Sequence, residues 1–176
     1  MSICAFTGHR PAKYPWKYNE RDSRCMALKS VLAQQIRRLE AAGVTDWLTG
    51  MAQGTDIWAA EIILERRKEN PALRLHCILP CEGQEVKWPM AERERYHSIL
   101  RQADEIVYVG REYNGACMRN RNYYLVDHSS ILLAVYDGSY RSGTGMTVRY
   151  AQKLGRKITA INPFTLSVEL LSSGCF

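Results

Sequence analysis

The sequence predicts a single α/β domain with a mostly parallel sheet, and three observations support this. Short apolar runs typical of buried strands recur along the chain. Between them lie segments whose apolar residues are spaced three and four apart, as in amphipathic helices. No linker, repeat or low-complexity segment interrupts this alternation, so we expect residues 1–176 to form one domain.

Six apolar runs are predicted to be strands. They cover residues 3–7, 45–49, 73–79, 105–109, 130–136 and 157–161. Strand and helix alternate regularly, which implies right-handed crossovers and a parallel sheet covered by helices on both faces. A Rossmann-like three-layer sandwich is therefore the expected architecture.

Five helices are predicted between the strands. The first begins at Ser23 and ends just before Gly43, which is placed as its C′ residue. The others cover residues 56–68, 89–102, 119–127 and 145–154, and Gly155 ends the last one. The final segment, "TLSVELLSSGCF", is expected to add a short strand or a short helix.

Composition and charge exclude several classes of protein. The chain is 46% hydrophobic and has no run near the roughly 20 apolar residues that a membrane span needs. Its N-terminus, "MSICAFTGHR", lacks the basic segment of a signal peptide, so we expect a cytoplasmic protein with no membrane association. The net charge of +6 suits an anionic ligand. However, the basic clusters alternate with glutamates on helices, which is more typical of a solvated face than of a nucleic-acid stripe.

The cysteines and histidines favour neither disulfides nor a metal centre. The six cysteines are scattered, and disulfides are not expected in a reducing compartment. His76, Cys77 and Cys81 come closest to a metal-binding set. Adjacent residues of a strand point to opposite faces, however, so His76 and Cys77 cannot easily share one ion. We therefore expect no metal and no resident cofactor.

The residues best suited to ligand binding follow the ends of the predicted strands. In an open parallel sheet these positions meet at one edge, where ligands bind. Exposed backbone N–H groups and helix dipoles at that edge favour negative charge. The expected ligand-binding residues are Gly8, His9, Arg10, Gly50, Gly54, Thr55, Asp56, Arg121, Ser142, Gly143, Thr144 and Gly145.

Two glycine-rich turns in this set are expected to bind different parts of a ligand. In "TGMAQGTDIWAAE", residues 49–61, Asp56 would repel a phosphate, so this helix start suits a sugar hydroxyl or a base amine. The phosphate is expected at residues 143–145, close to Arg141 and Arg149. "GSYRSGT", residues 138–144, has the glycine spacing of a P-loop without its lysine, which disfavours hydrolysis of nucleoside triphosphates. No Gly-x-Gly-x-x-Gly follows the first strand, which disfavours a dinucleotide dehydrogenase.

Four stretches carry a resemblance to a known family. They are "TGHRP", "TGMAQGTDIWAAE", "MRNRNYYLVDHSSILLAVYDG" and "SGTGMTVRYA", in the expected order over most of the chain. With them the chain resembles the SLOG superfamily and, within it, the YpsA-like family. The resemblance implies a Rossmann-like fold and a pocket for a nucleotide or a nucleotide-derived, ADP-ribose-like ligand, in a sensor or binding module. Relatives with this core often pair, so a homodimer is one expectation.

The LOG phosphoribohydrolases, relatives in the same superfamily, suggest an enzymatic alternative. They cleave the N-glycosidic bond of nucleoside monophosphates. Arg121 occupies the place of their signature arginine, but Thr147 stands where they have a glutamate. A threonine cannot stabilise an oxocarbenium-like state as a carboxylate does. If the protein is a divergent N-glycosidase, Glu82, Glu85 or Asp56 are the candidate catalytic carboxylates.

DNA-processing protein A, another relative, suggests single-stranded nucleic acid as a third possible ligand. Its Gly-Ile-Asp-x-x-Ala turn is similar to "GMAQGTDIWAAE". Binding without sequence preference would need aromatic platforms beside basic residues. Tyr14, Trp16 and Tyr18 alternate with Lys13 and Lys17, but we expect these rings to support the loop instead of binding bases.

Overall fold

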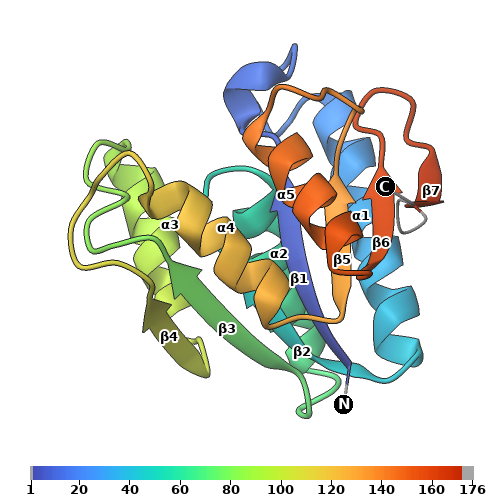
Figure 1. The fold of residues 1–176 in the computed structure, drawn as a ribbon, viewed down its shortest axis with the longest axis horizontal. Helices are drawn as coiled ribbons and strands as arrows, with labels where there is room; N and C mark the ends of the chain where they lie inside the picture. The colour runs from blue at the N-terminus through green and yellow to red at the C-terminus, as the bar shows by residue number, and fades with distance from the viewer. Residues whose placement is uncertain (1, 172–176) are drawn as a thin grey trace.

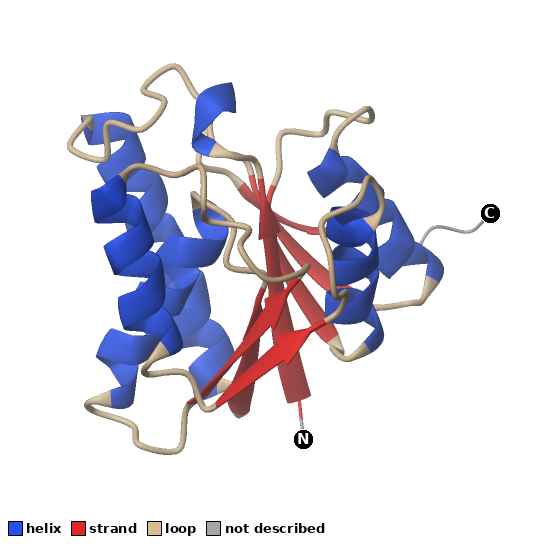
Figure 2. Cartoon of the chain, turned by 90° about the vertical axis from the view of Figure 1, so that its left-hand side faces the viewer, coloured by secondary structure: helices blue, strands red, loops and turns tan. Residues whose placement is uncertain are grey.

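The computed structural model describes residues 2–171 and has the expected three layers. One sheet lies between two layers of helices (Figure 2). Its strands are β1 (Ser2–Gly8), β2 (Val44–Thr49), β3 (Arg74–Leu79), β4 (Glu105–Tyr108), β5 (Ile131–Val135), β6 (Lys157–Ile161) and β7 (Val168–Leu171). The helices are α1 (Ser23–Ala41), α2 (Thr55–Arg67), α3 (Met90–Leu100), α4 (Cys117–Asp127) and α5 (Gly143–Lys153), with a short 3-10 turn at Pro11–Lys13.

The order of the strands places a switch point beside β1. The sheet runs β4-β3-β2-β1-β5-β6-β7, and all neighbours are parallel except β6 and β7. The chain first moves outward from β1 to β4, and α4 then leads it back to β5 on the other side of β1 (Figure 1). In an open sheet, ligands bind beyond the carboxyl ends of the strands where the order reverses. Here that point lies between β1 and β5.

Two apolar cores hold the layers together. On one face α1, α2 and α3 pack on the sheet around Trp47, Trp58 and other buried side chains. On the other face α4 and α5 pack through Leu125, Val126 and Val148. Alternate residues of β1 pack into the two cores, since Cys4 and Phe6 belong to the first and Ala5 to the second. This two-sided burial explains why the strands appear in the sequence as continuous apolar runs.

Each strand and helix predicted from the sequence is present, with ends that differ by no more than two residues. Gly43 follows the C-terminus of α1 with φ +93°, and Gly155 follows α5 with φ +66°, as expected of C′ glycines. The tail adds a strand, β7, which pairs antiparallel with β6; residues 172–176 lie outside the described part. Among the described helices none is both long and apolar enough to cross a membrane.

Candidate functional site

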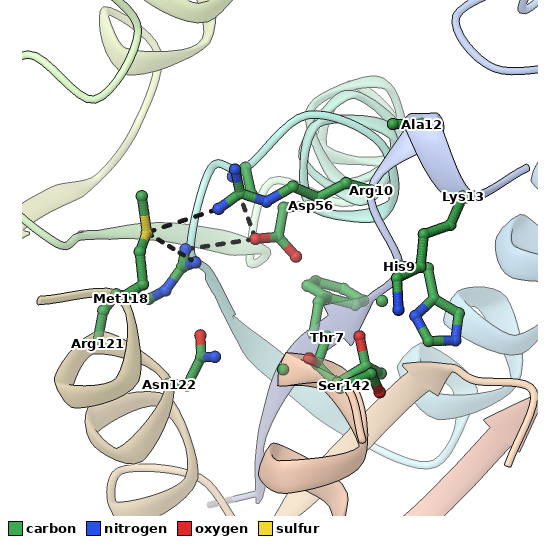
Figure 3. Close-up of a pocket in the computed structure, with 15 residues that line it drawn as sticks. Thr7, His9, Arg10, Ala12, Lys13, Asp56, Met118, Arg121, Asn122 and Ser142 are labelled. Carbon is green, nitrogen blue, oxygen red and sulfur yellow. Dashed lines mark hydrogen bonds and ion pairs between the residues drawn. The ribbon is translucent and has the colours of Figure 1, made fainter. Parts of the chain in front are cut away.

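A cavity of about 390 Å³ lies beyond the carboxyl end of β1, beside the start of α2, the first turns of α4 and the start of α5 (Figure 3). The loops that line it are far apart in the sequence, and the switch point of the sheet brings them together. Eight of the twelve predicted ligand-binding residues line this cavity: Gly8, His9, Arg10, Asp56, Arg121, Ser142, Gly143 and Thr144.

Arg121 is the most unusual side chain of the cavity. It is only 4% exposed, yet few of its donors are used. Its Nη1 lies 3.4 Å from Asp56 Oδ2, its Nη2 contacts Met118 Sδ at 3.9 Å, and no described atom accepts from its Nε. Burial lowers the pKa of Arg121, and neighbouring Arg10 acts in the same direction. A buried guanidinium with unsatisfied donors indicates a place for an additional acceptor.

Asp56 provides the nearest negative charge to Arg121. Its Oδ2 also accepts a hydrogen bond from the backbone N–H of Ala52, at 3.2 Å. Burial raises the pKa of the Asp56 carboxyl, and Arg121 acts against this shift. The pair is therefore buried and loosely bonded, unlike a close bidentate ion pair.

The positive charge of the cavity exceeds the negative charge. Its lining includes three cationic side chains, Arg10, Lys13 and Arg121, and one carboxylate, Asp56. Arg10 is exposed, and its only described side-chain hydrogen-bond partner is the sulfur of Met118, at 3.7 Å. Lys13 is exposed and has no ion pair within residues 2–171. The cavity is therefore suited electrostatically to an anion.

The start of α5 adds backbone donors. Ser142 caps this helix, because its Oγ accepts from Gly145 N–H at 2.9 Å. The N–H groups of Gly143 and Thr144 have no acceptor in the described part of the chain. Unpaired N–H groups at the start of a helix attract anions, so this end of the cavity suits a phosphate or carboxylate.

Arg141 and Arg149, which were expected near the phosphate, do not line the cavity. Arg149 instead donates to the carbonyl oxygen of Tyr140 at 2.7 Å and stacks on the Tyr140 ring, 3.8 Å from its centroid. The positive charge of the cavity comes instead from Arg10, Lys13 and Arg121, and the guanidinium of Arg10 lies beside Met118 of α4 (Figure 3).

The four other predicted ligand-binding residues shape the site without lining it. A Cβ on Gly50 would overlap the guanidinium of Arg121, and a Cβ on Gly8 would overlap the hydroxyl of Thr55. Gly54 is the N-cap of α2 and has φ +92°, a conformation that favours glycine. Gly145 passes close to the backbone oxygen of Ser139, so a side chain would clash there. These glycines let the walls of the cavity approach one another.

His9 is buried and bonded to a carboxylate. Its Nε2 lies 2.8 Å from Asp137 Oδ1. Burial alone would raise the pKa of Asp137, but hydrogen bonds from Ser139 and His9 outweigh it and lower the pKa to about 2. The pair ties the end of β1 to the loop after β5.

The carboxylates proposed for catalysis are dispersed. Glu82 and Glu85 do not line the cavity, and Glu85 Oε1 lies 3.2 Å from His97 Nε2. Thr147 is fully buried, and its hydroxyl donates to the carbonyl of Gly143 at 2.9 Å. Of the acidic residues in the described part of the chain, only Asp56 lines the cavity.

Sequence reasoning missed several residues that line the cavity. Thr7, Lys13, Met118 and Asn122 belong to it. Met118 and Asn122 stand three residues before and one residue after Arg121 on α4, so helical spacing could have indicated Met118. The side chains of Thr7 and Asn122 have no hydrogen bond within residues 2–171, which leaves both available to a ligand.

The aromatic residues after β1 mostly support the loop, as expected. Tyr14 and Trp16 are buried and stacked on each other, with ring centroids 4.7 Å apart. Tyr18 differs, because its side chain is 57% exposed.

The residues considered for a metal site have other roles. Cys77 is buried in a core, while His76 bonds to Asp46 and Glu105 at 2.9 Å each. No cluster of His, Cys, Asp and Glu within residues 2–171 is arranged to hold a metal.

Fold and cavity together define a Rossmann-like α/β protein with a positively charged hollow at the switch point of its sheet. Comparison with known proteins gives its family. The model of the YpsA SLOG family matches residues 4–166, so the chain belongs to that family.

Relatives and a solved structure agree with this assignment. A UPF0398 protein of Bacillus velezensis is 30% identical over 156 residues, covering 87% of this chain and 85% of the relative. The uncharacterised SPbeta prophage-derived protein YoqJ of Bacillus subtilis is 33% identical over 131 residues, covering 66% and 76%. The fold is similar to that of DNA processing protein A from Helicobacter pylori, whose structure was described for its single-stranded DNA binding. There the TM-score is 0.60 at 18% identity, over 92% of this chain and 65% of the other.

Proposed function

We propose that the protein binds a nucleotide or a nucleotide-derived, ADP-ribose-like ligand in the cavity at the switch point, as a sensor or binding module. The observation that carries the proposal is Arg121, a buried guanidinium with unsatisfied donors beside an excess of positive charge. Burying a cation so incompletely bonded is costly, and an anionic ligand would remove that cost.

The arrangement of the cavity suits two parts of one ligand. The phosphate is assigned to the N–H groups of Gly143 and Thr144, with Arg10 and Arg121 as charged partners. The sugar or base is assigned to Asp56 and to the free polar groups of Thr7 and Asn122. A volume of about 390 Å³ lies within the usual range for small-ligand pockets.

The alternative of a divergent N-glycosidase has weaker support. The glutamate of the hydrolases is replaced by Thr147, whose hydroxyl is already bonded within α5. Among the described residues, Asp56 is the one carboxylate that lines the cavity, and it faces Arg121. Incubation with nucleoside monophosphates, followed by assay for free base, tests this alternative directly. Release of base that Asp56→Asn abolishes would establish it.

Binding is tested by thermal shift and titration calorimetry with a panel of nucleotides, including adenosine monophosphate. A ligand that binds the folded state raises the melting temperature. Arg121→Ala is expected to weaken the best ligand by about 30-fold or more, since a charge-assisted hydrogen bond is lost. The domain is expected to stay folded, because Asp56 can take up a proton when its partner is removed.

Two further variants provide a second test of the cavity and a control. Arg10→Ala removes an exposed cation that forms no ion pair within the described residues, so it should weaken binding with little effect on stability. Arg119→Ala removes an exposed arginine of α4 that does not line the cavity, and it should leave binding unchanged. Equal affinity in all three variants and the wild type would contradict the proposal.

A further inference from the structure

A second cavity, of about 330 Å³, lies on the other side of the same two loop segments. In the segment after β1, Arg10, Ala12 and Lys13 line the first cavity, while Pro11 lines the second. In the segment before α2, Ala52 lines the first, while Gln53 and Gly54 line the second. These two segments form a thin partition between the cavities, and Pro11 packs against Gly54 within it.

The unbalanced charge of the second cavity is positive. Its lining contains two glutamates and two lysines. Glu20 pairs with Arg95 at 2.7 Å and with Lys29 at 2.8 Å, and Arg95 is shared with Glu92 at 3.6 Å and with Glu61 at 2.5 Å. These three carboxylates and two cations leave one negative charge, which the two lysines of the lining exceed. Lys17 and Lys87 are exposed and have no ion pair within residues 2–171. The cavity therefore presents two free ammonium groups to solvent.

Three aromatic side chains, Tyr18, Trp58 and Trp88, also line the cavity. The Trp58 ring is fixed by a hydrogen bond that its Nε1 donates to Glu20 at 2.8 Å. The Trp88 ring packs edge-on against Tyr96, with ring centroids 5.4 Å apart. Tyr18 is 57% exposed and, among described residues, makes no ring contact. The side-chain amide of Gln53 is also without a described partner. Planar rings, a free amide and free cations match a ligand that is both flat and anionic.

We propose that this second cavity is a separate site for a nucleoside monophosphate. The base would stack on Trp88 and Tyr18, with its edge within reach of the Gln53 amide, and the phosphate would lie near Lys17 and Lys87. Base stacking on aromatic rings tolerates any base, so the site would select for a phosphorylated nucleoside more than for a particular base. An acidic peptide would satisfy the lysines but would leave the rings without a partner.

The site is tested with adenosine monophosphate, adenosine and inorganic phosphate as probes. The full chain carrying Arg121→Ala is titrated first, so that the first cavity is weakened. In this background adenosine monophosphate is expected to bind and to quench tryptophan fluorescence, more tightly than either fragment. Adding Tyr18→Ser and Lys87→Ala should weaken it about tenfold or more. Both substituted residues are exposed, so the fold should be unaffected.

A matched control separates this effect from a general loss of charge and aromatic surface. Tyr113→Ser with Lys153→Ala removes the same two residue types from exposed positions outside both cavities, and it should not change binding. Equal affinity for phosphate and adenosine monophosphate would overturn the inference, because the rings would then contribute nothing. So would a Tyr18/Lys87 variant with unchanged affinity.

The outcomes for the two cavities are distinguishable. If Arg121→Ala abolishes all nucleotide binding, the second site is refuted and the first is supported. If Arg121→Ala has no effect while the Tyr18/Lys87 variant loses binding, the second site is supported and the first is refuted. Binding of a polyglutamate peptide that displaces the nucleotide and is unaffected by Tyr18→Ser would also overturn the assignment.

Discussion

Gly50 shows how a single backbone position controls the candidate site. A side chain there would occupy the space of the Arg121 guanidinium, which is itself buried beside Asp56. The φ of Gly50 is not positive, so alanine is compatible with its backbone. Glycine is therefore needed at position 50 to leave room for the Arg121 side chain, and not to allow the backbone conformation of the turn.

Gly50→Ala is accordingly predicted to displace Arg121 and to lower nucleotide affinity by about tenfold or more. Overpacking should also lower the free energy of unfolding by about 1–3 kcal/mol. Titration calorimetry and urea unfolding measure the two effects. Gly115→Ala is the control, since a Cβ at Gly115 meets nothing within 4 Å. Unchanged affinity in Gly50→Ala would mean that the position of Arg121 is not required for binding.

Helices α1, α2 and α3 are joined by one carboxylate, Glu20, in the loop before α1. It accepts hydrogen bonds from Lys29 of α1, Trp58 of α2 and Arg95 of α3. Partial burial alone would raise the pKa of Glu20, but these bonds outweigh it and lower the pKa from 4.5 to about 2. A carboxyl whose folded pKa is depressed contributes stability above its unfolded pKa and loses it as the pH falls.

Glu20→Gln is therefore predicted to lower the free energy of unfolding at pH 7 by about 1–2 kcal/mol, after discounting for partial solvent exposure. The loss should shrink between pH 4.5 and pH 2, where the wild-type carboxyl also becomes protonated. Urea unfolding at several pH values measures both effects. Glu112→Gln, at an exposed position with no described partner, should match the wild type throughout. An equal loss at pH 7 and pH 2 would show that ionisation of Glu20 is not the cause.

The elements were predictable because their signals are local. Buried segments can be recognised from the apolar run of β5 and from the helical spacing of apolar residues in α1. Gly43 and Gly155 indicate helix ends, because both adopt a positive φ that favours glycine. The 3-10 turn at Pro11–Lys13 gave no such signal, and with it Lys13 was missed as a cavity residue. Arg149 was misplaced because a tertiary contact with Tyr140 orients it away from the cavity.

For the candidate site, the sequence could predict which residues meet at one edge of the sheet but not how they contact one another. Parallel strands bring their carboxyl ends to one edge, so Arg10, Asp56, Arg121 and Thr144 could be expected to meet there. Which donors stay unsatisfied depends on distances between side chains that are 65 residues apart in the chain, as for Asp56 and Arg121. No sequence pattern encodes such distances. The second cavity was missed for the same reason, because its walls come from three separate segments.

The whole molecule has a modest positive charge, and this bears on the choice between a nucleotide and single-stranded nucleic acid. The net charge is +6, and several of the arginines are neutralised in ion pairs, such as Arg66 with Glu40 and Arg67 with Asp104. The two cavities are lined by five cationic side chains that have few or no carboxylate partners, and each has a volume suited to one small ligand. A long polyanion would gain few contacts beyond them.

The salt dependence of ligand affinity tests whether binding involves only the cations of the two cavities. The affinity for adenosine monophosphate and for a single-stranded oligonucleotide is determined at several salt concentrations. For a single strand the logarithm of the affinity falls with the logarithm of salt concentration by about 0.7 for each phosphate neutralised. A nucleotide-binding protein should give a slope no steeper than about −2 for both ligands, since only two or three cations line each cavity. A slope several times steeper for the oligonucleotide, with tighter binding than the nucleotide, would instead identify a single-strand-binding surface that extends beyond the two cavities.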